Sequence, residues 1–228
     1  MKRRTIALTA LMLVLILAGC GGGKATEGLE FTQRNGSYAV TGYHGSDVDV
    51  VIPDTYNDVP VTVIAEEAFA RSDIQSIRLG SNIETIEDFA FAYSTLLKKV
   101  ELNAALKEIG TFESYSMYLD GVFEGCTGLE TVSIPQNSQL EILGKGTFCD
   151  CEKLSGIELP DSLLMIGNSA FKNCVSLKSI TIPASVEHMQ YEVFENFTSQ
   201  QKIIVMGSTE EWTYTWNSDC EAEIVYKK

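Results

Sequence analysis

The side chains best suited to nucleophilic or metal chemistry in this chain of 228 residues are its six cysteines and two histidines. Five of the cysteines lie in the C-terminal half, at Cys126, Cys149, Cys151, Cys174 and Cys220. No two have Cys-x-x-Cys spacing, and an odd set cannot pair completely as disulfides. The sequence contains no His-Glu-x-x-His, Gly-x-Ser-x-Gly or phosphate-loop motif. We therefore expect no enzyme, no catalytic residue, no metal site and no cofactor, and we expect His44 and His188 at the surface.

The sixth cysteine, Cys20, follows a leader-like segment. The basic start "MKRR" precedes an uncharged apolar run over residues 6–18, which is shorter than the roughly 20 residues that span a bilayer. The run ends in "LAGC", which resembles a bacterial lipobox. The resemblance implies a signal peptide over residues 1–19 and a diacylglycerol on the Cys20 thiol. It also implies an exported protein, anchored to the membrane on its extracellular or periplasmic side. The alternative is an ordinary signal peptide followed by a chance cysteine.

The segment after the leader and the overall charge restrict the partners. Residues 20–28 comprise the lipidated cysteine and a glycine-rich stretch, which predicts a flexible tether. The formal net charge is −14, and loss of Lys2, Arg3 and Arg4 with the leader makes it more negative by three. Such a surface repels phosphate backbones, so we expect no nucleic-acid partner. It favours basic or neutral partners.

Phenylalanine recurs along the chain with an underlying step of 23 residues, at Phe69, Phe91, Phe123, Phe148, Phe171 and Phe194. Apolar residues recur at fixed offsets from each of them, including a Leu-x-x-Ile-x-Leu pattern that predicts a short strand. One such unit cannot bury its apolar residues alone. Successive units can do so by stacking, so that the phenylalanines form one row inside a solenoid.

The repeated segment "IGNSAFKNCVSLKSITIP", residues 166–183, resembles the BspA-like leucine-rich repeats of bacterial surface proteins. The resemblance implies an α/β repeat fold, a right-handed leucine-rich repeat solenoid with one short parallel strand per coil. The expected parts are an N-terminal β cap at 29–60, six coils at 61–206 and a C-terminal β cap at 207–228. Trp212 and Trp216 are expected to cover the core in the last part.

The cysteines at positions 126, 151 and 174 fall in one column of the repeat, three residues after each phenylalanine. We expect a row of small, buried, unreactive thiols, with a disulfide between neighbouring coils as the alternative. Cys149 falls outside this column, and we expect it to be more exposed. The outward positions of the predicted strands are mixed and polar, which is typical of a solvated sheet face.

The third coil carries an insertion over residues 111–121, and insertions in solenoids often form binding loops. Tyr115, Met117 and Tyr118 are the candidate binding residues, because tyrosine and methionine are common at interfaces. The alternative is that they fold back on the convex surface. The resulting hypothesis is a non-enzymatic, lipid-anchored module that binds a protein or glycan, and the family resemblance implies adhesion to host or neighbouring cells. The alternative is a structural spacer or envelope scaffold without a ligand.

Overall fold

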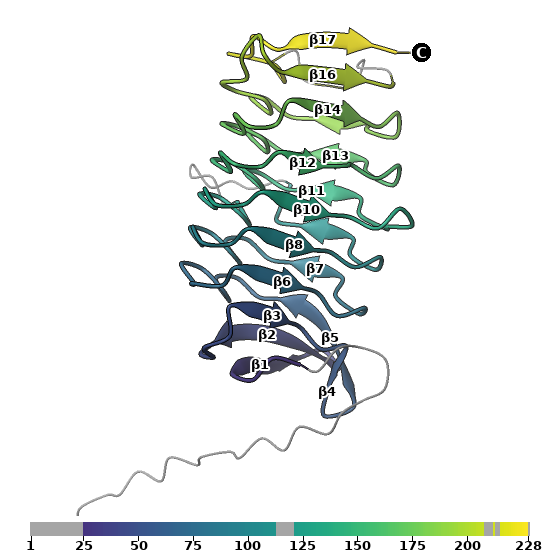
Figure 1. Ribbon diagram of the computed structural model, residues 1–228. Coiled ribbons are helices and arrows are strands. Elements are labelled where there is room, and N and C mark those ends of the chain that lie inside the picture. Colours follow the sequence, from purple (N-terminus) through teal and green to yellow (C-terminus); the bar gives the residue numbers. More distant parts are fainter. Residues whose placement is uncertain (1–24, 113–120, 208–211, 213–214, 228) are drawn as a thin grey trace, which may run out of the picture.

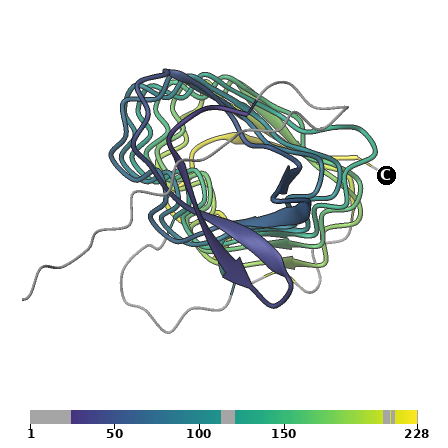
Figure 2. The same cartoon turned by 90° about the horizontal axis from the view of Figure 1, so that it is seen from below.

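The computed structural model describes residues 25–112, 121–207, 212 and 215–227. These residues wind into an elongated solenoid, in which the strands of successive coils lie side by side from one end of the molecule to the other (Figure 1). Viewed along the long axis, the coils superpose on one another (Figure 2). The predicted stacking of units of about 23 residues is therefore confirmed.

The first sheet holds the six strands that the Leu-x-x-Ile-x-Leu pattern predicts and one further strand at each end. Five of them form one parallel sheet: β3 (Asp49–Val51), β6 (Ser76–Arg78), β8 (Lys99–Glu101), β10 (Thr131–Ser133) and β12 (Gly156–Ile157). Three more continue the stack as a short parallel sheet: β14 (Ser179–Ile182), β16 (Lys202–Val205) and β17 (Glu223–Tyr226). The pairing is in register, so that Ile77 lies beside Val100 and Val100 beside Val132. The apolar columns of the sequence are therefore rows of neighbouring core residues.

A second sheet runs along another side of the coils, so that each coil holds two strands where the sequence predicted one. Its parallel strands are β5 (Val59–Ile64), β7 (Thr85–Ile86), β9 (Glu108–Ile109), β11 (Ile142–Leu143), β13 (Met165–Ile166) and β15 (His188–Met189). Most of them are two residues long, which is too short for an alternating apolar pattern to show in the sequence. Their backbone groups find partners between coils, as buried amides and carbonyls require.

The third side of each coil is built from turns. The expected α/β class includes helices, but the described residues contain none. In five of the six coils, two residues four positions apart adopt left-handed backbone conformations, as Ser169 (φ 54°) and Asn173 (φ 60°) do in one coil. A right-handed helix cannot pass through such residues. The amides of Phe171 and Asn173 instead donate hydrogen bonds to the carbonyls of Val193 and Glu195 in the next coil. All three sides of the solenoid are thus joined by hydrogen bonds between coils.

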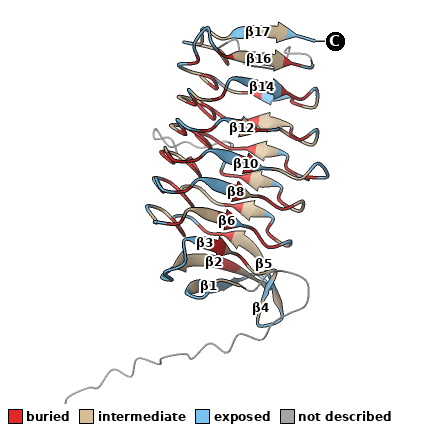
Figure 3. Cartoon of the chain, in the orientation of Figure 1, coloured by how far each residue is buried: buried red, intermediate tan, exposed pale blue. Residues whose placement is uncertain are grey.

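The phenylalanines form one row inside the solenoid, as predicted. Each of the six is at most 2% exposed, and the interior of every coil is buried (Figure 3). The ring centroids of neighbours lie 5.0 to 5.6 Å apart, and their planes are within 24° of parallel. This spacing lies within the range that aromatic pairs favour. The row ties each coil to the coils above and below it.

Both ends of the solenoid are covered by elements that extend the stack. At the N-terminal end, β1 (Leu29–Arg34) pairs antiparallel with β2 (Ser37–Tyr43), which lies parallel to β5, and β4 (Thr55–Tyr56) forms a hairpin with β5. At the C-terminal end, Trp212 and Trp216 are buried, as predicted, and the indole N–H of Trp212 donates to the carbonyl of Val186 at 3.1 Å. Strands β3 and β17 each add a rung beyond the six repeats. Within the described ranges, no helix is long and apolar enough to cross a bilayer.

Candidate functional site

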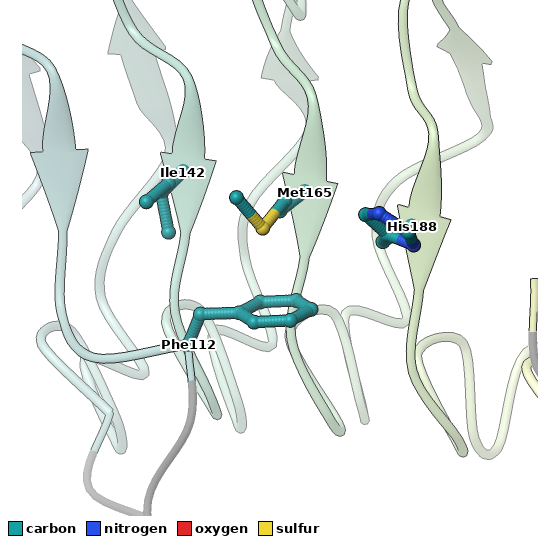
Figure 4. Close-up of a pocket in the computed structure, with 4 residues that line it drawn as sticks. All are labelled: Phe112, Ile142, Met165 and His188. Carbon is teal, nitrogen blue, oxygen red and sulfur yellow. The ribbon is translucent and has the colours of Figure 1, made fainter.

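A shallow pocket of about 380 Å³ lies on the outer face of the second sheet. Ile142, Met165 and His188 project from the neighbouring strands β11, β13 and β15, and Phe112 reaches across them from the edge (Figure 4). Ile142, Met165 and Phe112 are half-buried, whereas His188 is exposed. The pocket therefore has an apolar floor with a polar residue at one end.

The outward direction of these side chains follows from the strand geometry. Leu143 and Ile166 point into the core, and successive residues of a strand face opposite sides. Ile142 and Met165 precede them and must face outward. The same outward position holds Thr85 in β7 and Glu108 in β9, so the column changes from polar to apolar at β11.

The place of Phe112 is set by the turn that precedes it. Gly110 has a φ of 70°, in the left-handed region that favours glycine. The amide and the hydroxyl of Thr111 then donate to the Asp88 carboxylate at 2.7 and 2.9 Å. These contacts fix the chain just before Phe112, at the start of the insertion in the third coil.

The surroundings of the pocket are acidic. Glu108 stands directly beside Ile142 in the sheet, and Glu141 and Glu187 are exposed next to the pocket residues in sequence. Burial, together with the nearby Asp88 carboxylate, raises the pKa of Glu108. Its charged form is therefore held at some cost in free energy.

The predicted binding residues Tyr115, Met117 and Tyr118 lie outside the described residues, and so does the predicted lipidation site Cys20. The sequence interpretation missed Ile142 and Met165. The signal for them was present, because two successive coils carry an apolar residue in the outward slot just before a core residue. These positions belong to the second sheet, whereas the Leu-x-x-Ile-x-Leu pattern marks the outward positions of the first sheet alone.

The cysteine column is buried, as predicted, and its thiols make hydrogen bonds. Cys126, Cys151 and Cys174 are free and fully buried. Each thiol donates to the carbonyl of the phenylalanine one coil earlier, at 3.1 Å for Phe91, 3.2 Å for Phe123 and 3.2 Å for Phe148. Burial raises the pKa of Cys126 to about 12. Such thiols are poor nucleophiles, because the thiolate is the reactive form.

The prediction of a more exposed Cys149 is wrong, since this side chain is only 1% exposed. The equivalent position is Glu124 in the preceding coil and Lys172 in the next coil. The alignment follows from two backbone hydrogen bonds, from Gly125 N–H to the Cys149 carbonyl and from Asp150 N–H to the Lys172 carbonyl. Lys172 forms an ion pair with Glu195 at 2.6 Å. These longer neighbours cover the short cysteine side chain, and burial raises its pKa.

The two histidines lie at the surface, as expected, at different places on the solenoid. His44 lies in the loop that follows β2, where its imidazole is 3.1 Å from the Glu30 carboxylate and its side chain is 74% exposed. His188 lies beside Met165 at the pocket. In the part of the chain that the structure describes, no group of three or more His, Cys, Asp or Glu side chains is arranged to hold a metal ion.

Comparisons with known proteins agree with this architecture. The sequence profile of the BspA type leucine rich repeat region matches the chain in six copies, over residues 62–196 and 116–223. The structure is similar to that of a leucine-rich repeat protein from T. pallidum, with 24% identity and a TM-score of 0.68 over 81% of this chain and 86% of that one. A leucine-rich repeat protein from Bacteroides ovatus gives 20% identity and a TM-score of 0.49 over 88% and 66%. No curated protein matches the chain.

Proposed function

This chain belongs to the BspA-type leucine-rich repeat family, and from that premise we propose that it is a non-enzymatic binding module held at the cell surface by a lipid on Cys20. The partner is a protein or a glycan, and the binding surface is the outer face of the second sheet around Phe112, Ile142, Met165 and His188. The role of this binding is adhesion to a host or neighbouring cell. The fold alone does not fix the partner, so the proposal depends on the site.

The pocket is the observation that carries this proposal. Ile142 and Met165 are apolar residues held outward on a rigid parallel sheet, at positions where β7 and β9 carry Thr85 and Glu108. Stacking of the coils does not require them to be apolar, because they face away from the core. An apolar patch bordered by polar residues is typical of a binding surface. Its place on paired strands gives the partner a preorganised surface and lowers the entropic cost of binding.

The non-enzymatic part of the proposal has separate support. The thiols of Cys126, Cys151 and Cys174 are used as hydrogen-bond donors inside the core. Burial raises the pKa of each of them, which works against nucleophilic catalysis. The lipobox resemblance and the tether support display at a membrane surface.

The test is affinity capture with the soluble domain from residue 24 onward, displayed on beads and exposed to surface extracts of other cells. We expect a partner to bind the wild-type domain and to be lost with Met165→Asp. Ile204→Asp is the matched control, because Ile204 also faces outward from a strand but lies on the first sheet in β16. A partner retained equally by Met165→Asp and wild type would place binding elsewhere. Failure of every form to retain a partner would favour a structural spacer.

A further inference from the structure

The charges around the pocket are unbalanced, and this indicates the chemistry of the partner. Glu108 lies beside Ile142 at the β9 end of the apolar floor, and Glu187 is next to His188 at the β15 end. Glu141 precedes Ile142 and is exposed. The apolar floor thus has one carboxylate beside it in the sheet, Glu108 in β9, and two more on the residues just before β11 and β15.

Two of the cations on this side of the coils are already paired with carboxylates. The Lys107 ammonium contacts the Glu84 carboxylate at 2.8 Å, and Arg34 forms an ion pair with Glu87. Among the residues that the structure describes, no ion pair involves Glu108, Glu141 or Glu187. These three carboxylates therefore add negative charge beside the pocket to the negative charge of the whole chain.

One of these carboxylates stands to gain from a bound cation. Glu108 is partly desolvated and lies near Asp88, and both effects disfavour its charged form. A Lys or Arg side chain placed beside Glu108 would offset the repulsion from Asp88. Because the site is partly withdrawn from water, that pairing would be stronger than a fully exposed one.

The pocket floor favours an apolar side chain over a sugar. Small-molecule pockets usually measure about 300–1,000 Å³, so a volume of about 380 Å³ suits one or two side chains. Ile142 and Met165 offer neither donors nor strong acceptors to hydroxyl groups. A sugar pressed against them would lose hydrogen bonds to water without replacement. An aliphatic side chain loses none, and Phe112 provides a wall for it (Figure 4).

We propose that this pocket binds a cationic segment of a partner protein, inserting an aliphatic side chain between Phe112 and Met165 and placing neighbouring Lys or Arg residues beside Glu108 and Glu187. This inference rests on the proposed function and names its partner class. The apolar contact supplies affinity at the centre, and the carboxylates at the rim select positive charge and speed association.

The experiment measures fluorescence anisotropy of labelled peptides with the full-length protein purified in nonionic detergent, with empty micelles as the blank. The probe is Gly-Lys-Leu-Lys-Leu-Gly, and the two comparison peptides replace either both lysines by glutamate or both leucines by serine. We expect the probe to bind at least about tenfold more tightly than either comparison peptide, a difference of about 1.4 kcal/mol. Equal binding of the serine peptide would mean attraction by charge alone and would overturn the proposal.

Variants locate the binding. Met165→Ser and Ile142→Ser should each weaken probe binding by about tenfold, and Glu108→Gln by about threefold. Ile204→Ser and Glu158→Gln, on the first-sheet side of the coil, are the matched controls and should change it by less than about twofold. Circular dichroism and thermal unfolding establish that each variant is folded. Equal losses in the controls would overturn the proposal, because binding would then be nonspecific.

The outcomes separate this inference from the proposed function. Absence of probe binding, together with capture of a partner that Met165→Asp loses, would overturn the cationic-peptide inference and leave the binding module standing. A captured partner that proves to be a glycan would likewise overturn the cationic-peptide inference and leave the binding module standing. Probe binding that depends on Met165 and Glu108 would support the inference, whether or not the extracts contain a natural partner.

Discussion

The thiol of Cys174 donates a hydrogen bond to the carbonyl oxygen of Phe148 in the preceding coil, with 3.2 Å between the sulfur and the oxygen. In the second coil a serine makes the equivalent contact, from the Ser94 hydroxyl to the Phe69 carbonyl at 2.7 Å. In four of the six coils the column thus holds a small side chain that donates a hydrogen bond to a phenylalanine carbonyl of the neighbouring coil. This shared contact explains why Ser and Cys share the column, and it links the cysteines to the phenylalanine row.

Replacing Cys174 tests this role. Cys174→Ala removes the donor and leaves a small cavity, and we expect a loss of about 1–2 kcal/mol in the free energy of unfolding. Cys174→Ser should cost less, because its hydroxyl can bond to the Phe148 carbonyl as Ser94 bonds to Phe69. Urea denaturation of the three proteins measures both values. A serine variant no more stable than the alanine variant would show that the thiol acts only by filling space.

The phenylalanine row should dominate the stability of the solenoid. Phe171 is fully buried between Phe148 and Phe194, with ring centroids 5.5 and 5.6 Å away. Phe171→Ala should therefore cost about 3–5 kcal/mol in unfolding free energy, measured by urea denaturation. Phe89→Ala is the matched control, since Phe89 lies outside the row, is only half-buried and should cost no more than about 1.5 kcal/mol. Similar costs at the two positions would contradict a dominant role for the row.

The columns were predictable because every coil repeats the same burial pattern. The phenylalanines and the strand residues such as Ile77 and Val100 are core positions in every unit, so six weak signals add together. Single positions were less predictable. Position 200 breaks the leucine column, and the next residue compensates: the buried amide of Gln201 donates to the carbonyls of Cys174 and Leu177 at 3.1 and 3.0 Å. No column statistic indicates a substitution of that kind.

The pocket was harder to predict for a related reason. Ile142 and Met165 are visible as apolar residues in the sequence, but their direction depends on the second sheet, whose two-residue strands give no periodic signal. The burial of Cys149 depends on the side chains of adjoining coils, at positions 124 and 172. Properties that repeat in every coil were thus predictable, whereas those set by single side chains that differ between adjoining coils were not.

Glu108 should make the protein less stable at neutral pH than a glutamine would. Its pKa is raised in the folded protein, so the unfolded chain loses this proton more readily. The contribution of Glu108 to stability is therefore present below the unfolded-state pKa and is lost as the pH rises through the folded-state pKa. Because the group is only partly buried and water screens its charge, Glu108→Gln should gain at most about 0.5 kcal/mol at pH 7.

Thermal unfolding of wild type and Glu108→Gln at pH 4 and pH 7 measures this effect. The advantage of the glutamine variant should be larger at pH 7, whereas its affinity for the cationic probe should be lower there. Glu158→Gln controls for the loss of one surface charge. If stability changed between pH 4 and pH 7 by the same amount in the glutamine variant and in wild type, the raised pKa of Glu108 would not be the cause.

The five cysteines that follow Cys20 in the sequence should differ in reactivity. Burial raises the pKa of all five thiols, but Cys220 is partly exposed, whereas Cys126, Cys149, Cys151 and Cys174 are buried and closed to reagents. Brief treatment of the native soluble domain with iodoacetamide at pH 7.5 should therefore modify Cys220 alone, and peptide mass spectrometry identifies the site. Treatment in urea should modify all five. Modification of Cys149 at the rate of Cys220 in the native protein would contradict its burial.

Cys20 should carry the membrane anchor. Each buried methylene contributes about 0.8 kcal/mol to membrane binding, so two or more acyl chains hold a protein stably where a single chain does not. Cells expressing the wild-type chain and fed a labelled fatty acid should therefore incorporate label into this protein, and Cys20→Ser should abolish the label and release the protein from the membrane fraction. Cys220→Ser is the matched control, because it removes a partly exposed cysteine from the other end of the chain, and it should keep both the label and the membrane attachment. Label or membrane attachment that persists in Cys20→Ser would mean that another group holds the protein, and the surface-display part of the proposed function would then lose its basis.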